Sequence, residues 1–115
     1  MTLNVEMVTF DCGDPDGLAG WWAEQFGGKT HIILADEFTA VTFPEGLRLG
    51  FQKVPDPTPG KNRVHLDLSA ADVDAEVSRL TAAGAIEVGR HQFGESFRWV
   101  VLADPEGNVF CVVRQ

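Results

Sequence analysis

The residues of this chain best suited to chemistry lie in its second half, where His65 and Asp67 alternate with apolar residues over positions 63–68. Alternate side chains of a strand point to the same face, so His65 and Asp67 are expected to form a polar pair. Histidine is the side chain most easily poised for proton transfer near neutral pH. We therefore take this pair as the candidate catalytic pair, and the alternative is a histidine that only hydrogen-bonds to a neighbour in a half-polar pocket. His31, on a predicted strand, and His91, in a predicted loop, have no clustered partners and are interpreted as surface residues.

Other candidate ligand-binding residues come from three further segments that are predicted to be strands. Trp99 begins an apolar run and could hold a planar ligand by stacking, with plain core packing as the alternative. Met7 and Thr9 share one face of the first predicted strand. Cys111 lies in the last strand, where a small packed apolar side chain is a better interpretation than a nucleophile.

Composition and motifs exclude several classes of function. The formal net charge of −8 argues against binding to nucleic acid, because a phosphate backbone would be repelled. No apolar run approaches the roughly 20 residues that span a bilayer, and the first residues do not form a signal peptide, so no membrane partner is expected. Cys12 and Cys111 are the only cysteines, which predicts reduced thiols in a cytoplasmic protein. Dinucleotide-binding, phosphate-loop and nucleophile-elbow motifs are absent from the sequence.

The first half of the chain is predicted to form one helix among four strands. Asp14 is followed by a proline, a pattern typical of a helix start, and Gly27 is expected to end this helix. Leu18, Trp22 and Phe26 are spaced at helical intervals and predict its buried stripe. The strands are predicted at residues 5–11, 29–35, 38–43 and 47–54.

The same order of elements recurs after a connector that contains three prolines. Residues 69–72 have the pattern of a capping box that opens a second helix, and Gly84 is expected to end it. Residues 104–108 predict a turn between two apolar strands. The strands are predicted at residues 63–68, 86–88, 97–103 and 109–114. The sequence therefore predicts an α+β fold in which the order βαβββ occurs twice. Residues 1–115 are expected to form one domain, with a first module at residues 1–54, a connector at 55–62 and a second module at 63–115.

Three segments of the chain, residues 5–28, 60–85 and 99–113, resemble the vicinal-oxygen-chelate superfamily, which includes glyoxalases, bleomycin-resistance proteins and dioxygenases. The resemblance is greatest to its glyoxalase-like branch. It implies that the paired βαβββ modules form an open, cup-shaped mixed sheet in which small molecules bind. Relatives often close the cup between two chains, so we expect a homodimer.

The resemblance also implies where the four metal ligands of metal-using relatives would lie. His65 matches a family histidine, whereas Met7, Cys111 and either Gly50 or Gln52 stand at the other positions. A thioether and a neutral thiol are poor ligands for magnesium, manganese or ferrous iron. We therefore expect no cofactor, and a divalent metal with His65 as its candidate ligand is the disfavoured alternative.

Two functions follow from these observations. The first is the binding of a small hydrophobic or aromatic molecule in the cup without the usual metal. The alternative is a small lyase, isomerase or dioxygenase-like enzyme that uses His65 and Asp67 or a rebuilt divalent-metal site. The residues expected to line the ligand site are Met7, Thr9, Gln52, His65, Asp67, Trp99 and Cys111.

Overall fold

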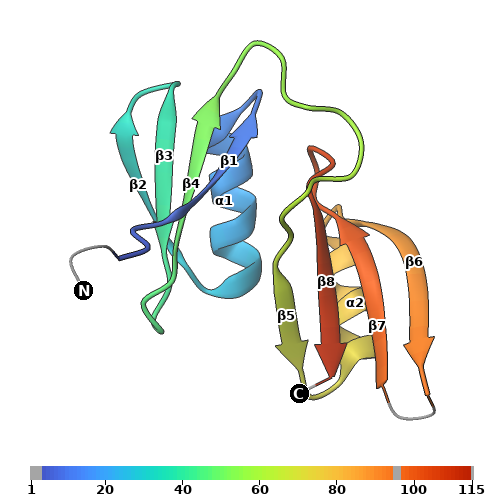
Figure 1. Ribbon diagram of the computed structural model, residues 1–115. Coiled ribbons are helices and arrows are strands. Elements are labelled where there is room, and N and C mark those ends of the chain that lie inside the picture. Colours follow the sequence, from blue (N-terminus) through green and yellow to red (C-terminus); the bar gives the residue numbers. More distant parts are fainter. Residues whose placement is uncertain (1–3, 95–96, 115) are drawn as a thin grey trace. The chain divides into compact units, whose positions relative to one another are not determined.

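A computed structural model describes residues 4–94 and 97–114 of the chain (Figure 1). The chain divides into two compact units, residues 1–58 and 59–115, and each contains one helix and one four-stranded sheet. The predicted tandem βαβββ order is confirmed. The elements are β1 (Val8–Cys12), α1 (Pro15–Phe26), β2 (Lys29–Leu34), β3 (Phe38–Thr42), β4 (Arg48–Lys53), β5 (Asp67–Ala70), α2 (Val73–Ala82), β6 (Ile86–Phe93), β7 (Phe97–Ala103) and β8 (Val109–Arg114).

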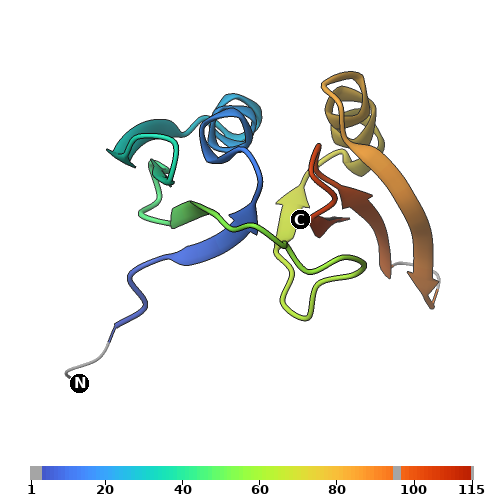
Figure 2. The ribbon, with the colours of Figure 1, turned by 90° about the horizontal axis from the view of Figure 1, so that it is seen from above.

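The sheet of the first unit has the strand order β1-β4-β3-β2, in which β1 and β4 are parallel and the other pairs antiparallel. Helix α1 covers one face of this sheet (Figure 2). Asp14 caps the helix by accepting a hydrogen bond from the Gly17 amide at 3.2 Å, and Gly27 ends it at a φ of 71°. Trp22 is fully buried and stacks on Phe26, with ring centroids 5.0 Å apart. The predicted helix and its buried stripe are therefore confirmed.

The sheet of the second unit repeats this plan with the order β5-β8-β7-β6, and α2 covers one of its faces. The predicted turn at residues 104–108 joins β7 to β8. Asp104 is buried, and its Oδ1 atom accepts hydrogen bonds from the backbone amides of Glu106 and Asn108, both at 2.9 Å. Gly107 has a φ of 91°, which a residue with a side chain rarely adopts. The turn is thus held from inside by one carboxylate.

Two predicted boundaries at the start of the second unit are wrong. The strand expected at residues 63–68 is β5, Asp67–Ala70, and Ser69 pairs with Val113 inside it. Ser69 therefore does not open α2. Asp72 is the N-cap instead, and its side chain accepts a hydrogen bond from the Ala75 amide at 3.0 Å. The prediction failed because Ser69 is paired with β8 in the sheet, so its backbone cannot also form the start of a helix.

Strand β6 is longer than the expected residues 86–88 and runs from Ile86 to Phe93. Its register with β7 shifts between Glu87 and Gly89, so a bulge lets the strand continue past the glycine. His91, expected in a loop without partners, therefore lies on a strand opposite Trp99. Within the described residues, no helix is long and apolar enough to cross a membrane.

Candidate functional site

The structure brings His65, Asp67 and Cys111 together in the second unit. Asp67 and Cys111 are directly opposite each other on the parallel strands β5 and β8. His65 lies just before β5, and its Nδ1 atom is 3.1 Å from Oδ1 of Asp67. One side-chain ligand atom from each of the three residues lies within 4.8 Å of the others. We call these three residues the polar trio.

The polar trio combines two exposed side chains with one buried thiol. Cys111 is 6% exposed, whereas His65 and Asp67 are open to solvent. Burial raises the pKa of the Cys111 thiol, and the negative charge of Asp67 and its hydrogen bond to the thiol raise this pKa further. The thiol is therefore neutral at physiological pH, which agrees with a packed residue rather than a nucleophile.

An apolar pocket of about 330 Å³ lies in the same unit, and Val101, which lines it, is paired with Cys111. We call the face of the β5–β8 sheet away from α2 the distal face, and Val101, Ala103 and Val109 line the pocket there. Trp99, Val101 and Cys111 share this face, because residues opposite or two apart in a sheet point the same way. The pocket is of a size that accommodates a small molecule.

His91 stacks on Trp99 next to this pocket. Their ring centroids are 5.3 Å apart with an angle of 26° between the planes, and the two residues are paired across β6 and β7. His91 also lines the apolar pocket. The pair offers a flat aromatic edge with a polar imidazole, which suits a planar ligand that carries one or two polar groups.

The remaining predicted residues lie in the first unit. Gly50 lies opposite Thr9, and a Cβ atom at this glycine would be 2.7 Å from Thr9 Oγ1 and 2.9 Å from Met7 Sδ. Met7 and Thr9 therefore meet over Gly50, as strand parity predicted. Gln52 is two positions further along β4 and is exposed beside Asp11.

The register of the two sheets decides between Gly50 and Gln52, which the sequence left open. Gly50 and Cys111 are each the third residue of the last strand of their unit. Each lies opposite the residue that is third from the end of the preceding strand, Ala40 in β3 and Val101 in β7. Gly50 is therefore the structural counterpart of Cys111. Gln52 is the counterpart of Val113.

The donor atoms present do not fit the four-ligand metal site that the resemblance implies. At the counterpart positions of the first unit, Met7 offers only a thioether and Gly50 offers no side chain. The second unit offers the imidazole, carboxylate and thiol of the polar trio. This set of donor atoms can bind zinc only after the Cys111 thiol has lost its proton. Burial and the neighbouring Asp67 raise the pKa of this thiol and so oppose that loss.

Sequence reasoning missed the part of the site contributed by β6 and by the connector. Val88, His91 and Lys61 all line the apolar pocket. The signal for His91 was present, since residues 86–93 include several β-favouring side chains, but Gly89 interrupts the run. No pattern in the sequence marked Lys61.

Comparison with known proteins places these features in context. A sequence model described as "Glyoxalase-like domain" matches residues 7–113. A glyoxalase/bleomycin resistance protein/dioxygenase family enzyme from Burkholderia phytofirmans PsJN has a similar structure, with a TM-score of 0.81 and 20% identity over 97% of this chain and 98% of that one. A superfamily member from Sphaerobacter thermophilus gives 0.76 and 19%, over 100% and 99% of the two chains.

A third similar structure is titled lactoylglutathione lyase, from Agrobacterium tumefaciens. It has a TM-score of 0.71 and 16% identity, over 99% of this chain and 95% of that one. At identities this low, the similarity shows that the proteins share a fold, and it does not show that they share a ligand. Among curated proteins, no sequence matches this chain.

Proposed function

The chain belongs to the glyoxalase-like domain family, and on that premise we propose that it binds a small apolar or aromatic molecule on the distal face of its second unit, without the usual metal. The observation that carries the proposal is the stacked His91–Trp99 pair, of which His91 lines the apolar pocket of about 330 Å³. Burial of an aromatic ring against these side chains removes apolar area from water, which is the main source of affinity in such pockets.

The chemistry of the neighbouring groups supports binding of a largely neutral ligand. Val101, Ala103 and Val109 provide the apolar wall, while Lys61 and His91 contribute the polar side chains of the lining. A protonated Cys111, which is paired with Val101, adds no charge there. Polar groups at the rim would then orient a ligand whose body is apolar.

A thermal-shift screen of aromatic fragments tests this proposal. A fragment at about 100 times its Kd should stabilise the protein by about 2.7 kcal/mol. Trp99→Ala should remove the shift, whereas Trp21→Ala, which changes a tryptophan on α1 in the other unit, should leave it intact. Fragment binding that is equally strong in both variants would contradict a site at Trp99.

A second candidate function, favoured by the 3.1 Å contact between His65 and Asp67, is a lyase or isomerase reaction on a carbonyl compound. If Asp67 accepts the proton of Nδ1, then Nε2 of His65 is left with a lone pair that can take a proton from a carbon next to the carbonyl. The similar structure titled lactoylglutathione lyase makes this reaction class relevant to the fold.

Metal analysis separates both metal-free candidates from an enzyme with a rebuilt divalent-metal site. The protein would be purified without chelator and without a metal-affinity step, and its divalent metal content measured. We expect no stoichiometric metal and no change in thermal stability on adding nickel, zinc, manganese or iron. One equivalent of metal that is lost in His65→Ala would instead support the enzyme with a rebuilt metal site.

We further propose that the protein is a cytoplasmic homodimer. Cys12 and Cys111 are both buried thiols, as expected in a reducing compartment. The edge strand β2 exposes Ile32, Ile33 and Leu34, and such an apolar edge favours pairing with another chain. Light scattering coupled to size-exclusion chromatography should give twice the chain mass of 12.5 kDa.

A further inference from the structure

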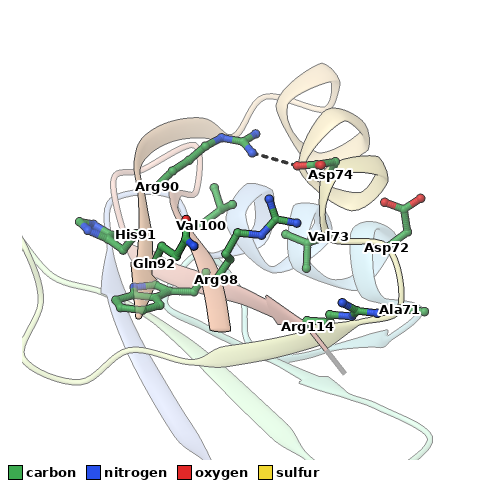
Figure 3. Close-up of a pocket in the computed structure, with 11 residues that line it drawn as sticks. Ala71, Asp72, Val73, Asp74, Arg90, His91, Gln92, Arg98, Val100 and Arg114 are labelled. Atoms are coloured by element: carbon green, nitrogen blue, oxygen red, sulfur yellow. Dashed lines mark hydrogen bonds and ion pairs between the residues drawn. The ribbon is translucent and has the colours of Figure 1, made fainter. Parts of the chain in front are cut away.

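A larger cavity, of about 500 Å³, lies in the second unit next to the beginning of α2 (Figure 3). Arg90 and Gln92 on β6, Arg98 on β7 and Arg114 on β8 contribute to its walls, together with Val73 at the start of the helix. Its volume lies in the range of small-molecule sites. It differs from the apolar pocket in its lining: His91 borders both, whereas Trp99, on which His91 stacks, lines only this larger cavity.

The register of the strands places the polar lining of this cavity in one row. Gln92 lies opposite Arg98, and Ala70 lies opposite Arg114. Because antiparallel β7 and β8 pair Trp99 with Val113, the next positions, Arg98 and Arg114, are opposite each other. They share the face of Val100, which α2 covers. Two like charges opposite each other on adjacent strands are unfavourable, and a bound anion would relieve this repulsion.

Two carboxylates, Asp72 and Asp74, line the cavity with the arginines, and the hydrogen bond from Arg90 and the charges of Arg90 and Arg98 help to lower the pKa of Asp74. Asp74 forms an ion pair with Arg90 at 2.9 Å, and Glu87 forms a second one with the same guanidinium. Asp72 accepts the capping hydrogen bond from Ala75. Over residues 4–94 and 97–114, neither Arg98 nor Arg114 forms an ion pair. Figure 3 shows the Arg98 side chain directed toward Val73 and the first turn of α2.

We propose that this cavity binds a small organic anion, a carboxylate or a phosphate monoester, between Arg98 and Arg114. Guanidinium groups bind both anions through paired charge-assisted hydrogen bonds. The amino-terminal end of the ten-residue helix α2 adds a favourable partial charge. Val73 and Val100 are positioned to contact an apolar body attached to the anion. In a chain of net charge −8, three of the nine lysine and arginine residues line this one cavity, against two carboxylates, Asp72 and Asp74.

Titration of the ¹⁵N-labelled protein with benzoate and with phenyl phosphate tests the proposal. Benzyl alcohol serves as the neutral match, and sodium chloride keeps the ionic strength constant. We expect saturable shifts of the amide signals of Val73, Arg98 and Arg114 with the anions and not with the alcohol. Tighter binding of phenyl phosphate would identify a phosphate site, and tighter binding of benzoate a carboxylate site.

Matched variants complete the test. Arg98→Gln and Arg114→Gln should each weaken anion binding by about tenfold or more, since each removes a charge-assisted hydrogen bond. Arg79→Gln removes one positive charge from α2 at its exposed pair with Glu76 and should leave the affinity unchanged. The proposal is overturned if neither anion binds saturably, if Arg98→Gln binds as tightly as Arg79→Gln, or if the shifts fall only on Val101, Ala103 and Val109. This site does not depend on the proposed function: Trp99 also lines this cavity, but the arginine variants and the amide signals of Val73 and Arg114 report on the anion site, whereas the signals of Val101, Ala103 and Val109 report on the apolar pocket.

Discussion

Asp67 lies directly opposite Cys111 across the β5–β8 ladder, and the carboxylate accepts a hydrogen bond from the thiol. This pairing keeps a proton on the sulfur at the position where the resemblance implies a metal-binding carboxylate. The proton has to leave before the sulfur can act as a strong nucleophile or metal ligand. The protonation state of Cys111 therefore distinguishes a metal-free binding site from a metal site in this protein.

Asp67→Asn should lower the pKa of Cys111. Burial, the first cause of the raised pKa, remains in this variant, but the negative charge of Asp67 is removed. The thiol should therefore titrate at lower pH than in the parent protein, and its alkylation by iodoacetamide near pH 8 should become faster. Cys111→Ala identifies the modified site, because the other thiol, Cys12, is fully buried. An unchanged pH profile in Asp67→Asn would show that the carboxylate does not act on the sulfur.

The stability of the protein should fall in alkaline solution. The folded state raises the pKa of Cys111 above the ordinary thiol value of 9.0, so above about that pH the unfolded chain loses this proton more readily than the folded chain. The free energy of unfolding should then decrease as the pH rises through this range and remain constant for this group below it. Urea unfolding at several pH values measures the slope. Cys111→Ala should have a shallower slope, and an equal slope in both proteins would assign the effect to other groups.

Gly50→Ala should destabilise the first unit by about 1–3 kcal/mol, the usual range for overpacking. A Cβ atom there would lie 2.7 Å from Thr9 Oγ1 and 2.8 Å from Phe38 Cε1, so side chains on both neighbouring strands must shift. Gly20→Ala is the matched control, because its Cβ atom meets nothing within 4 Å on helix α1. That substitution should stabilise the protein by about 0.5–1 kcal/mol. Chemical denaturation of the two variants should give effects of opposite sign.

Asp104→Ala should destabilise the second unit by about 2–4 kcal/mol, since it leaves two part-buried amides of the β7–β8 turn without their acceptor. Oδ1 of Asp104 accepts hydrogen bonds from the amides of Glu106 and Asn108, and Oδ2 accepts one from Asn108 Nδ2 at 2.9 Å. Asn108→Ala removes only the side-chain donor and should cost less. In a double-mutant cycle, the combined loss should be smaller than the sum of the two single losses. Full additivity would show that the two side chains are not coupled.

Local patterns predicted the parts of the structure that depend on neighbouring residues. Asp14 followed by Pro15 predicted the start of α1, and the spacing of Leu18 and Trp22 predicted the face that it buries. The turn at Asp104 was equally clear, because a short run of turn-forming residues separates two apolar strands. These features are predictable because their hydrogen bonds and spacings lie within one or two turns of chain.

Patterns failed where strand pairing competes with local preference. Ser69 has the side chain of a helix cap, but its place opposite Val113 puts it in β5. Gly89 looked like the end of β6, but a bulge keeps the strand paired with β7 as far as Phe93. In both cases the partner strand lies outside the window that a local pattern covers, so its contribution to the free energy was not visible.

The sequence alone determined the repeated βαβββ plan and the alternation that puts His65 and Asp67 on one side of the chain. It also determined that Met7 and Cys111 replace the ligand types of metal-using relatives. Only the tertiary structure decided that Cys111 faces Asp67, that His91 stacks on Trp99, and that Arg98 lies opposite Arg114. The physical reason is register: the composition of a strand sets which residues share a face, but hydrogen bonding to distant strands sets which residues meet.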